Sequence, residues 1–319
     1  MKSHQRNIAI GVDLGATTVK TGVVSSDGSI IYQNKLPTNA ERGPSSVVHQ
    51  IEASVEDALK HTDGRAVAGI GIGSPGVVTA DGVVKSPPNM AAWEEVRLAD
   101  EVRKMFKRHT VVVENDANAA ALAEARFGAG KMFPDFLFVI WGTGVGGGIM
   151  LGGKIFRGPT GGAGEIGHVC IDRNGPECNC GSRGCVEAFI GQRYLSQRTA
   201  ERLKEKPKSK ILQLVEGDLS RLEPFYIAQA AQVGDSLARE ILTEAGSLLG
   251  IALAGAMNTL DLRVSIIGGG VSAAGDFVIR AIQNSTKSHV LRPLRPDIRV
   301  LRAQLGNNAG ILGAAGLVL

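Results

Sequence analysis

Four side chains that bind soft metal ions lie close together near the middle of the chain. Their spacing is His168-x9-Cys178-x-Cys180-x4-Cys185. One imidazole and three thiolates form a tetrahedral set of ligands for zinc, and a group of free thiols is the alternative. Because four protein ligands leave no position open for water or substrate, we expect a zinc ion that holds a loop and does not act as a Lewis acid. Cys170 falls outside the set, and we expect it to be a small buried apolar residue.

Polar residues stand at the end of a predicted buried strand. In VVVENDANAAALAEA (111–125) the strand leads into Glu114, Asn115 and Asp116, and a helix rich in alanine comes next. A carboxylate at the carboxyl end of a strand in an open α/β sheet lies where ligands bind. Asp116 is therefore a candidate general base. It is equally a candidate for the plain N-cap of the alanine-rich helix.

Further acidic and imidazole groups flank the cysteines. Glu165 and His168 are three residues apart in GGAGEIGH, and Glu187 follows the last cysteine of the cluster. On a helical turn, residues three apart share one face. Such a group binds a polyol through paired hydrogen bonds, or else it supports the metal ligands through hydrogen bonds to them.

Glycine-rich turns between strands occur twice, as DLGATT (13–18) and GTGVGGG (142–148), in a chain with 42 glycines. Turns of this kind let backbone N–H groups surround an anion, and nearby threonine hydroxyls add donors. The alternative is two ordinary hairpin turns. Asp13 opens the first turn, and an aspartate beside a phosphate site indicates Mg²⁺.

Two common nucleotide-binding motifs are excluded by the residues that come after the glycines. GTGVGG (142–147) matches the dinucleotide-binding pattern G-x-G-x-x-G, but a strand pattern comes next where that motif requires a helix. GIMLGGKI (148–155) resembles a P-loop, but Ile155 stands where a Ser or Thr must bind Mg²⁺.

The elements that position these residues form a repeated pattern. Apolar runs predict strands at 8–12, 19–24, 30–36, 66–78 and 110–116, with helices at 45–61 and 95–108. Residues 135–158 again read as strand, glycine turn, strand, turn and strand. Helices fill most of 186–260, a strand runs into a glycine turn at 263–272, and a helix of small residues closes the chain. The pattern suggests an internal duplication.

The bulk composition excludes several classes of protein. The chain has 319 residues, 44% hydrophobic and 21% charged, with a net charge of +4 spread over mixed signs, so we expect no nucleic-acid partner. Its longest apolar run, 248–257, is shorter than the roughly 18–20 residues that span a bilayer, and no signal peptide is visible. We therefore expect no membrane partner and a cytoplasmic location, where cysteines stay reduced and a disulfide is disfavoured.

With these motifs in place, the chain resembles the ROK family (repressor, open reading frame, kinase), and within it most the bacterial zinc-containing glucokinases. The resemblance rests on DLGATTVK (13–20), GIGSPGVV (71–78), PNMAAW (88–93), ENDANAAALAE (114–124), WGTGVGGGIMLGGKIFRGPTGGAGEIGH (141–168), CNCGSRGCVE (178–187) and IIGGGVS (266–272). It implies an α/β fold with two RNase H-like domains of the actin and hexokinase type around a cleft. We expect a small domain at 1–117 plus 306–319, and a large domain at 118–305 that carries the zinc loop.

The resemblance also implies an activity, ATP-dependent phosphorylation of the 6-hydroxyl of glucose with Mg²⁺ and a structural zinc ion. Asp116 then looks like the general base, and all four residues of the His168 cluster match the zinc ligands of the family. One ring nitrogen of His168 would bind zinc while the other faces the sugar. The implied sugar ligands are Gly76, Asn89, Asn115, Asp116, Glu165, His168 and Glu187. The implied nucleotide and phosphate residues are Asp13, Gly15, Thr17, Thr18, Gly142, Thr143, Gly144, Gly146, Gly147, Gly269 and Gly270.

Several alternatives remain at this point. The substrate can be another hexose, such as N-acetylmannosamine, N-acetylglucosamine, fructose or allose, and the donor can be polyphosphate. A sugar-binding protein without catalysis is disfavoured because Asp116 and both glycine turns are intact. A sugar-responsive repressor is disfavoured because only twelve residues precede Asp13, too few for a helix-turn-helix. The resemblance also implies a homodimer or homotetramer.

Overall fold

The computed structural model describes residues 8–88, 90 and 93–319 of the chain. These residues form two compact units. The first comprises the chain up to Pro134 together with Gly148–Gly164 and Leu305–Leu319, and the second comprises Asp135–Gly147 and Glu165–Gln304. The two domains expected from the sequence, with boundaries at 117/118 and 305/306, stay a prediction.

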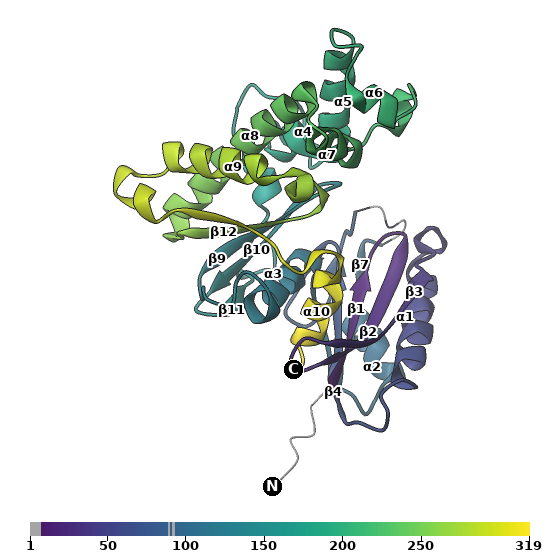
Figure 1. Cartoon of the computed structure of the whole chain (residues 1–319). Helices are drawn as coiled ribbons and strands as arrows, with labels where there is room; N and C mark the ends of the chain where they lie inside the picture. The colour runs from purple at the N-terminus through teal and green to yellow at the C-terminus, as the bar shows by residue number, and fades with distance from the viewer. Residues whose placement is uncertain (1–7, 89, 91–92) are drawn as a thin grey trace. The chain divides into compact units, whose positions relative to one another are not determined.

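A five-stranded sheet forms the centre of the first unit (Figure 1). Its order is β3-β2-β1-β4-β8, in which β1, β2 and β3 are an antiparallel meander and β4 and β8 run parallel to β1. The bounds are β1 Ile8–Leu14, β2 Thr18–Ser25, β3 Ile30–Pro37, β4 Val67–Ser74 and β8 Val111–Asn115. All five strands lie where the apolar runs predict them.

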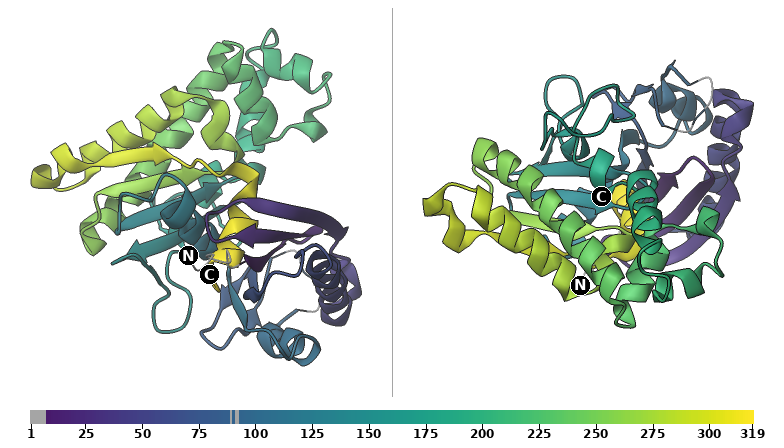
Figure 2. Two further views of the ribbon diagram at one scale, coloured as in Figure 1. Left: turned by 60° about the horizontal axis from the view of Figure 1, so that its bottom comes forward. Right: turned by 90° about the horizontal axis from the view of Figure 1, so that it is seen from above.

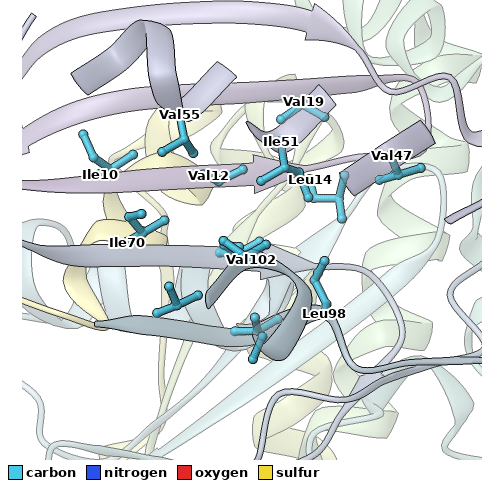
Figure 3. Packing of buried hydrophobic residues seen from close by; sticks show 14 of the residues in the cluster. Ile10, Val12, Leu14, Val19, Val47, Ile51, Val55, Ile70, Leu98 and Val102 are labelled. Atoms are coloured by element: carbon cyan, nitrogen blue, oxygen red, sulfur yellow. The ribbon is translucent and has the colours of Figure 1, made fainter. Parts of the chain in front are cut away.

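One face of this sheet is covered by helices α1 (Pro44–Leu59) and α2 (Leu98–Met105). Alternate side chains of β1 point toward these helices and pack against their apolar residues (Figure 3). The labelled members of this core are Ile10, Val12, Leu14, Val19, Val47, Ile51, Val55, Ile70, Leu98 and Val102. Burial of these side chains supplies the main stabilisation of the sheet, at about 25 cal/mol per Å² of apolar surface.

The opposite face of the sheet is lined with glycine and is covered by α10 (Ala309–Gly316) and α3 (Asp116–Phe127). A Cβ atom on Gly71 of β4 would lie 1.7 Å from the backbone oxygen of Ala314, and one on Gly11 of β1 would lie 2.1 Å from that of Ile311. The helix backbone therefore rests directly on the strands. This contact accounts for part of the unusual glycine content and for the small residues of the closing helix.

A small three-stranded sheet lies between β4 and α2 in the chain, and one of its strands occupies residues that the sequence predicts to be helical. It consists of β5 (Val77–Val78), β6 (Val84–Lys85) and β7 (Glu95–Val96) in that order. The sequence predicts a helix over 95–108, but Glu95 and Val96 pair with β6 and the helix begins only at Leu98. Backbone pairing with a strand distant in sequence overrides the local helical pattern there.

The second five-stranded sheet repeats the strand order of the first. Its order is β11-β10-β9-β12-β13, with β10 and β11 antiparallel and β12 parallel to both β9 and β13. The bounds are β9 Phe136–Trp141, β10 Val145–Leu151, β11 Lys154–Phe156, β12 Val264–Gly268 and β13 Arg299–Arg302. In each sheet, three consecutive strands form a meander. Two later strands extend the sheet on the side of the first strand of that meander, β1 in one sheet and β9 in the other. This repetition agrees with the internal duplication that the sequence suggests.

The helices of the second unit occupy most of the predicted 186–260 segment. They are α4 Glu187–Ile190, α5 Gln192–Leu203, α6 Lys210–Leu214, α7 Pro224–Gln232, α8 Ser236–Leu260 and, later in the chain, α9 Asp276–His289. The long helices α8 and α9 lie side by side (Figure 2). Gly250 of α8 permits this close approach, because a Cβ there would lie 2.7 Å from the backbone oxygen of Ile282.

Helix α8 is long and apolar enough to cross a membrane, judged by length and composition only. The sequence did not predict such a helix, because its longest unbroken apolar run covers only residues 248–257. Within the structure 56% of the apolar window is buried. Packing against α9 gives the helix the environment of a core helix, and core helices of soluble proteins meet the same criterion.

Candidate active site and metal centre

The carboxyl ends of three parallel strands bring the first group of predicted residues together. In the register of β1, β4 and β8, Asp13 pairs with Gly73, Gly73 with Glu114, and Ser74 with Asn115. Asp13, Asn115 and Asp116 therefore lie at one edge of the sheet of the first unit. Ligands bind at this edge in open α/β sheets.

The N-cap of helix α3 is Asn115, and Asp116 is the first residue of the helix. The Asn115 Oδ1 atom accepts a hydrogen bond of 3.0 Å from the backbone N–H of Asn118. The sequence left open whether Asp116 serves as the cap, and the capping bond of Asn115 answers that question. A carboxylate in the first turn of a helix is stabilised by the positive end of the helix dipole.

The carboxylate of Asp116 is oriented by two donors from its own turn. Its Oδ1 atom accepts from the backbone N–H of Ala117 at 2.8 Å and from Asn115 Nδ2 at 3.2 Å. Asn115 Nδ2 also donates to the backbone oxygen of Gly76 at 3.0 Å. Asn115 thus connects three points, namely the helix start, the carboxylate and the loop after β4. Such an arrangement holds a half-buried carboxylate in one position.

Gly76 needs to be a glycine for reasons of backbone conformation. Its φ is +89°, and a Cβ there would lie 2.7 Å from the backbone oxygen of Lys85. The backbone oxygen of Gly76 accepts from the Asn115 side chain, and a sugar-binding role for Gly76 stays a prediction. Asn89, another predicted sugar ligand, lies outside the residues that the structure describes.

Asp13 faces the first turn of α10 and an ion-pair partner on the next strand. Lys20 Nζ lies 3.2 Å from Asp13 Oδ2, because the two residues are opposite each other in the β1/β2 hairpin. A Cβ atom on Gly310 would lie 2.5 Å from Asp13 Cγ, so only glycine lets α10 approach the carboxylate so closely. Lys20 was missed as a site residue by sequence reasoning, although the hairpin register places it beside Asp13.

The predicted glycine turn at 15–18 joins β1 to β2 directly after Asp13. The N–H of Gly15 donates to the backbone oxygen of Thr18 at 2.9 Å, and Thr38 N–H donates to that of Thr17 at 3.0 Å. The Thr17 side chain is exposed. The turn therefore presents a hydroxyl at the same sheet edge as the carboxylate of Asp13.

The second glycine turn is built around a carboxylate in the second unit. Glu187 Oε2 accepts from the backbone N–H of Val145 at 2.8 Å, and a Cβ on Gly144 would lie 2.7 Å from the same oxygen. The N–H of Gln192 donates to the backbone oxygen of Thr143 at 2.9 Å. The turn ends at Gly144, and the predicted nucleotide residues Gly146 and Gly147 belong to strand β10.

Gly269 and Gly270 follow strand β12, whose end is beside that of β9 in a parallel pair. Gly269 has a φ of +84°, and a Cβ there would lie 2.1 Å from the backbone oxygen of Trp141, the last residue of β9. The second unit thus gathers Gly142, Thr143, Gly144, Gly269 and Gly270 at the carboxyl edge of its parallel strands. This is the edge equivalent to the one that carries Asp116 in the first unit.

The four predicted zinc ligands converge on one point. A ligand atom from each of His168, Cys178, Cys180 and Cys185 lies within 4.8 Å of those of the other three. The Cys180 and Cys185 sulfurs are 3.7 Å apart, as are the Cys178 sulfur and His168 Nδ1. In a tetrahedron with a Zn–S bond of about 2.3 Å, two sulfurs are about 3.8 Å apart. The set therefore fits a tetrahedral zinc ion in both chemistry and spacing.

The thiols of this cluster have shifted acidities. Burial raises the pKa of Cys185 to about 12 and also raises the pKa of Cys178 above its ordinary value. A hydrogen bond from the Ser182 backbone lowers the pKa of Cys180. A metal ion bound by thiolates must displace these protons, so metal binding and proton release are coupled.

The prediction that Cys170 is buried is wrong, because its side chain is exposed. The residue forms a backbone bridge with Cys185, one of the cluster residues, which is fully buried. The predicted sugar ligand Glu165 lies directly before the short 3-10 helix Ile166–His168, and it is exposed like His168. The sequence left open whether the two residues share a helical turn, and the structure places them at the two ends of one.

Comparison with known proteins places this arrangement in a family. The model of the ROK family matches residues 9–319. The chain belongs to the ROK family. A glucokinase of Thermotoga maritima is 35% identical over 310 residues, covering 97% of this chain and 96% of its own, and a glucokinase of Streptomyces coelicolor is 37% identical over 314 residues, covering 97% of both.

A solved structure of this ROK family is also similar over nearly the whole chain. The glucokinase of Streptomyces griseus, determined in complex with glucose and AMPPNP, superposes with a TM-score of 0.84 at 37% identity, covering 98% of this chain and 99% of its own. The fold is therefore the two-domain α/β fold of ROK sugar kinases, of the actin and hexokinase type, as the sequence motifs predict.

Proposed function

We propose that the protein is an ATP-dependent glucokinase, which transfers the γ-phosphoryl group of ATP to the 6-hydroxyl of glucose. The observation that carries the proposal is the oriented carboxylate of Asp116, held by Asn115 and Ala117 at the ligand-binding edge of the sheet. The glucokinase relatives at 35% and 37% identity support the choice of substrate.

In this mechanism, Asp116 is the general base. A sugar hydroxyl is a weak nucleophile, and its proton has to move to a carboxylate within hydrogen-bond reach as the O–P bond forms. The two donors on Oδ1 hold the Asp116 carboxylate in one orientation before the sugar arrives. The residues proposed to bind the sugar are Asn115, Glu165, His168, Glu187, Gly76 and Asn89. Phosphoryl transfer depends mainly on such positioning and on neutralising charge.

The proposed phosphate contacts come from the two glycine turns and from Gly269 and Gly270. The glycine backbone of these turns and the hydroxyls of Thr17, Thr18 and Thr143 suit the polyphosphate of a nucleotide. Mg²⁺ is the ion expected with ATP, and Asp13 is the acidic group that would approach it. The ion, when bound, neutralises the developing charge on the phosphates. Lys20, beside Asp13, adds a further positive charge at this turn.

A zinc ion is proposed for the set of three cysteines and His168, in a structural role. The ion would fix the tautomer of His168 and the course of the loop that carries Glu165 and Glu187. The cytoplasmic location, the absence of nucleic-acid and membrane partners, and a homodimer or homotetramer stay predictions.

The test is a coupled assay for ADP release with a panel of glucose, fructose, allose, N-acetylglucosamine and N-acetylmannosamine. We expect the highest kcat/KM with glucose, and the Asp116→Asn variant to lose activity by about 10²- to 10⁴-fold, the range for a general base. Replacing ATP by polyphosphate identifies the donor. A wild-type protein that binds glucose but releases no more ADP than the variant would contradict the proposal, and a preference for another sugar would correct the substrate.

A further inference from the structure

A buried carboxylate that the proposed mechanism does not use lies directly before the Asn115 and Asp116 pair. Glu114 is the next-to-last residue of strand β8, and only 2% of its side chain is exposed. An ionised side chain buried to this degree is costly unless charged and polar partners surround it. The partners of Glu114 therefore indicate its role.

Glu114 Oε1 accepts two hydrogen bonds from the turn that carries the proposed base. One is from the backbone N–H of Asn115 at 2.9 Å, and the other is from Asn118 Nδ2 at 3.0 Å. Asn115 in turn donates to Asp116 Oδ1 at 3.2 Å. The carboxylate of Glu114 is thus one hydrogen-bonded residue away from that of Asp116.

Glu114 Oε2 pairs with an arginine from a distant part of the same unit. Arg157 Nε donates to it at 2.5 Å, and the arginine comes directly after strand β11. The backbone oxygen of Arg157 accepts from Ala163 N–H at 3.1 Å, which closes the loop 157–163. That loop runs in sequence straight to Glu165. Arg157 neutralises the buried charge and ties strand β8 to this loop.

Asn118 is held in one orientation by the same carboxylate. Its side chain is 1% exposed, and its Oδ1 atom has no hydrogen-bond partner in the described part of the chain. Because its Nδ2 atom donates to Glu114, an acceptor at position 114 decides which way the amide points. Glu114 therefore holds the start of α3 through two hydrogen bonds, one from the backbone of Asn115 and one from the side chain of Asn118.

We propose that the Glu114–Arg157 ion pair is a positioning device for the proposed sugar-binding Asn115 and the proposed base Asp116. The pair fixes the strand-to-helix turn from which both side chains project. This inference rests on the proposed kinase function for its kinetic consequence, whereas the positioning itself is a property of the first unit alone. Misplacing a reacting group by about 1 Å lowers rates by about 10²-fold.

The test compares Arg157→Met, Glu114→Gln and the double variant. Arg157→Met leaves a buried carboxylate without its counter-charge. In Glu114→Gln, an amide has one oxygen and one NH₂ group, so a donor must face either Arg157 or the Asn115 turn. The double variant removes the arginine and leaves the glutamine oxygen free to accept from the Asn115 N–H. Arg97→Met, which removes the arginine of an exposed ion pair in the same unit, is the matched control.

We expect each single variant to lower kcat/KM for glucose by about 10- to 100-fold, with the KM for ATP unchanged, and the double variant to recover most of that loss. Hydrogen exchange of the 111–118 segment should be faster in the single variants and close to wild type in the double variant. The Arg97→Met control should match wild type in both measurements.

Two kinetic results would overturn the inference if the wild type is an active kinase. If the wild type is active and both single variants keep its kcat and glucose KM, the pair does not position the site. If the double variant is as impaired as the singles, the pair acts only through general packing. If the wild type phosphorylates no sugar, the kinase proposal fails, and hydrogen exchange still decides whether the pair holds the turn.

Discussion

Replacing Gly71 by alanine would test how directly α10 rests on the first sheet. A Cβ on Gly71 would lie 1.7 Å from the backbone oxygen of Ala314, and the three nearest heavy atoms all belong to the main chain of Ala314. To restore an ordinary van der Waals separation, helix and strand would have to move apart by about 2 Å. A flexible side chain is not available to absorb this displacement.

The expected cost follows from that displacement. Overpacking in a rigid core costs about 1–3 kcal/mol, and a clash between two backbones belongs at the upper end, near about 3 kcal/mol. With an unfolding entropy of about 2.1 cal/mol/K per residue, this lowers the midpoint of thermal unfolding by about 5 to 10 °C. The smaller figure applies if the whole chain unfolds together, and the larger if the first unit unfolds alone.

The assay is calorimetry of wild type, Gly71→Ala and a matched control, Gly73→Ala. Gly73 lies on the same strand and faces the same side, but its Cβ would come no closer than 3.4 Å, to Ala119 Cβ. We therefore expect the control to unfold within about 2 °C of wild type. Because α10 also contacts Asp13 through Gly310, Gly71→Ala should raise the KM for ATP more than that for glucose. Equal unfolding temperatures for both variants would refute the packing argument.

Three further outcomes are expected. Cys180→Ala should lose bound zinc, measured by atomic absorption, and raise the KM for glucose while circular dichroism stays native; a zinc-free, folded variant with unchanged glucose KM would show that the metal does not orient the sugar ligands. Asp57→Asn should lower the unfolding temperature at pH 7, and below about pH 4 that temperature should fall less steeply with pH than in the wild type. The reason is that the hydrogen bond from Tyr32 holds the pKa of Asp57 below its usual value in the folded protein. The stability that this gives is present above the pKa of the unfolded state and is lost as the pH falls through the pKa of the folded state. An unchanged acid slope would contradict this assignment. Glu187→Ala should raise the KM for ATP more than Glu187→Gln does, because only glutamine keeps an acceptor for the Val145 N–H; equal KM values would argue against that contact.

The fold was predictable where one local pattern decides the structure. Apolar alternation located the strands of both sheets, and the glycine turns located the ends of β1 and β9. At Glu95 and Val96 the local pattern favoured a helix, but pairing with β6 prevailed. Strand pairing depends on a partner that is distant in sequence, and a single sequence gives no local signal of it.

The candidate site shows the same division between local and long-range information. The spacing of the cysteines and His168 predicted a cluster, and the structure brings their ligand atoms together. The exposure of Cys170 was missed, because burial depends on which side of a loop faces the core. The ion pair of Glu114 with Arg157 was missed as well, since the two are 43 positions apart in sequence and only the folded sheet joins them.

The glycine-lined face of the first sheet has a consequence for how the protein is made. Of the two helices that cover it, α10 is formed by Ala309–Gly316, whereas the strands beneath it begin at Ile8. On the ribosome the first sheet is therefore synthesised long before the helix that covers it. Contacts so far apart in sequence form late and slowly. Until α10 is made, the part of the glycine-lined face that it covers is exposed. We therefore expect chains truncated before residue 309 to aggregate or to need a chaperone.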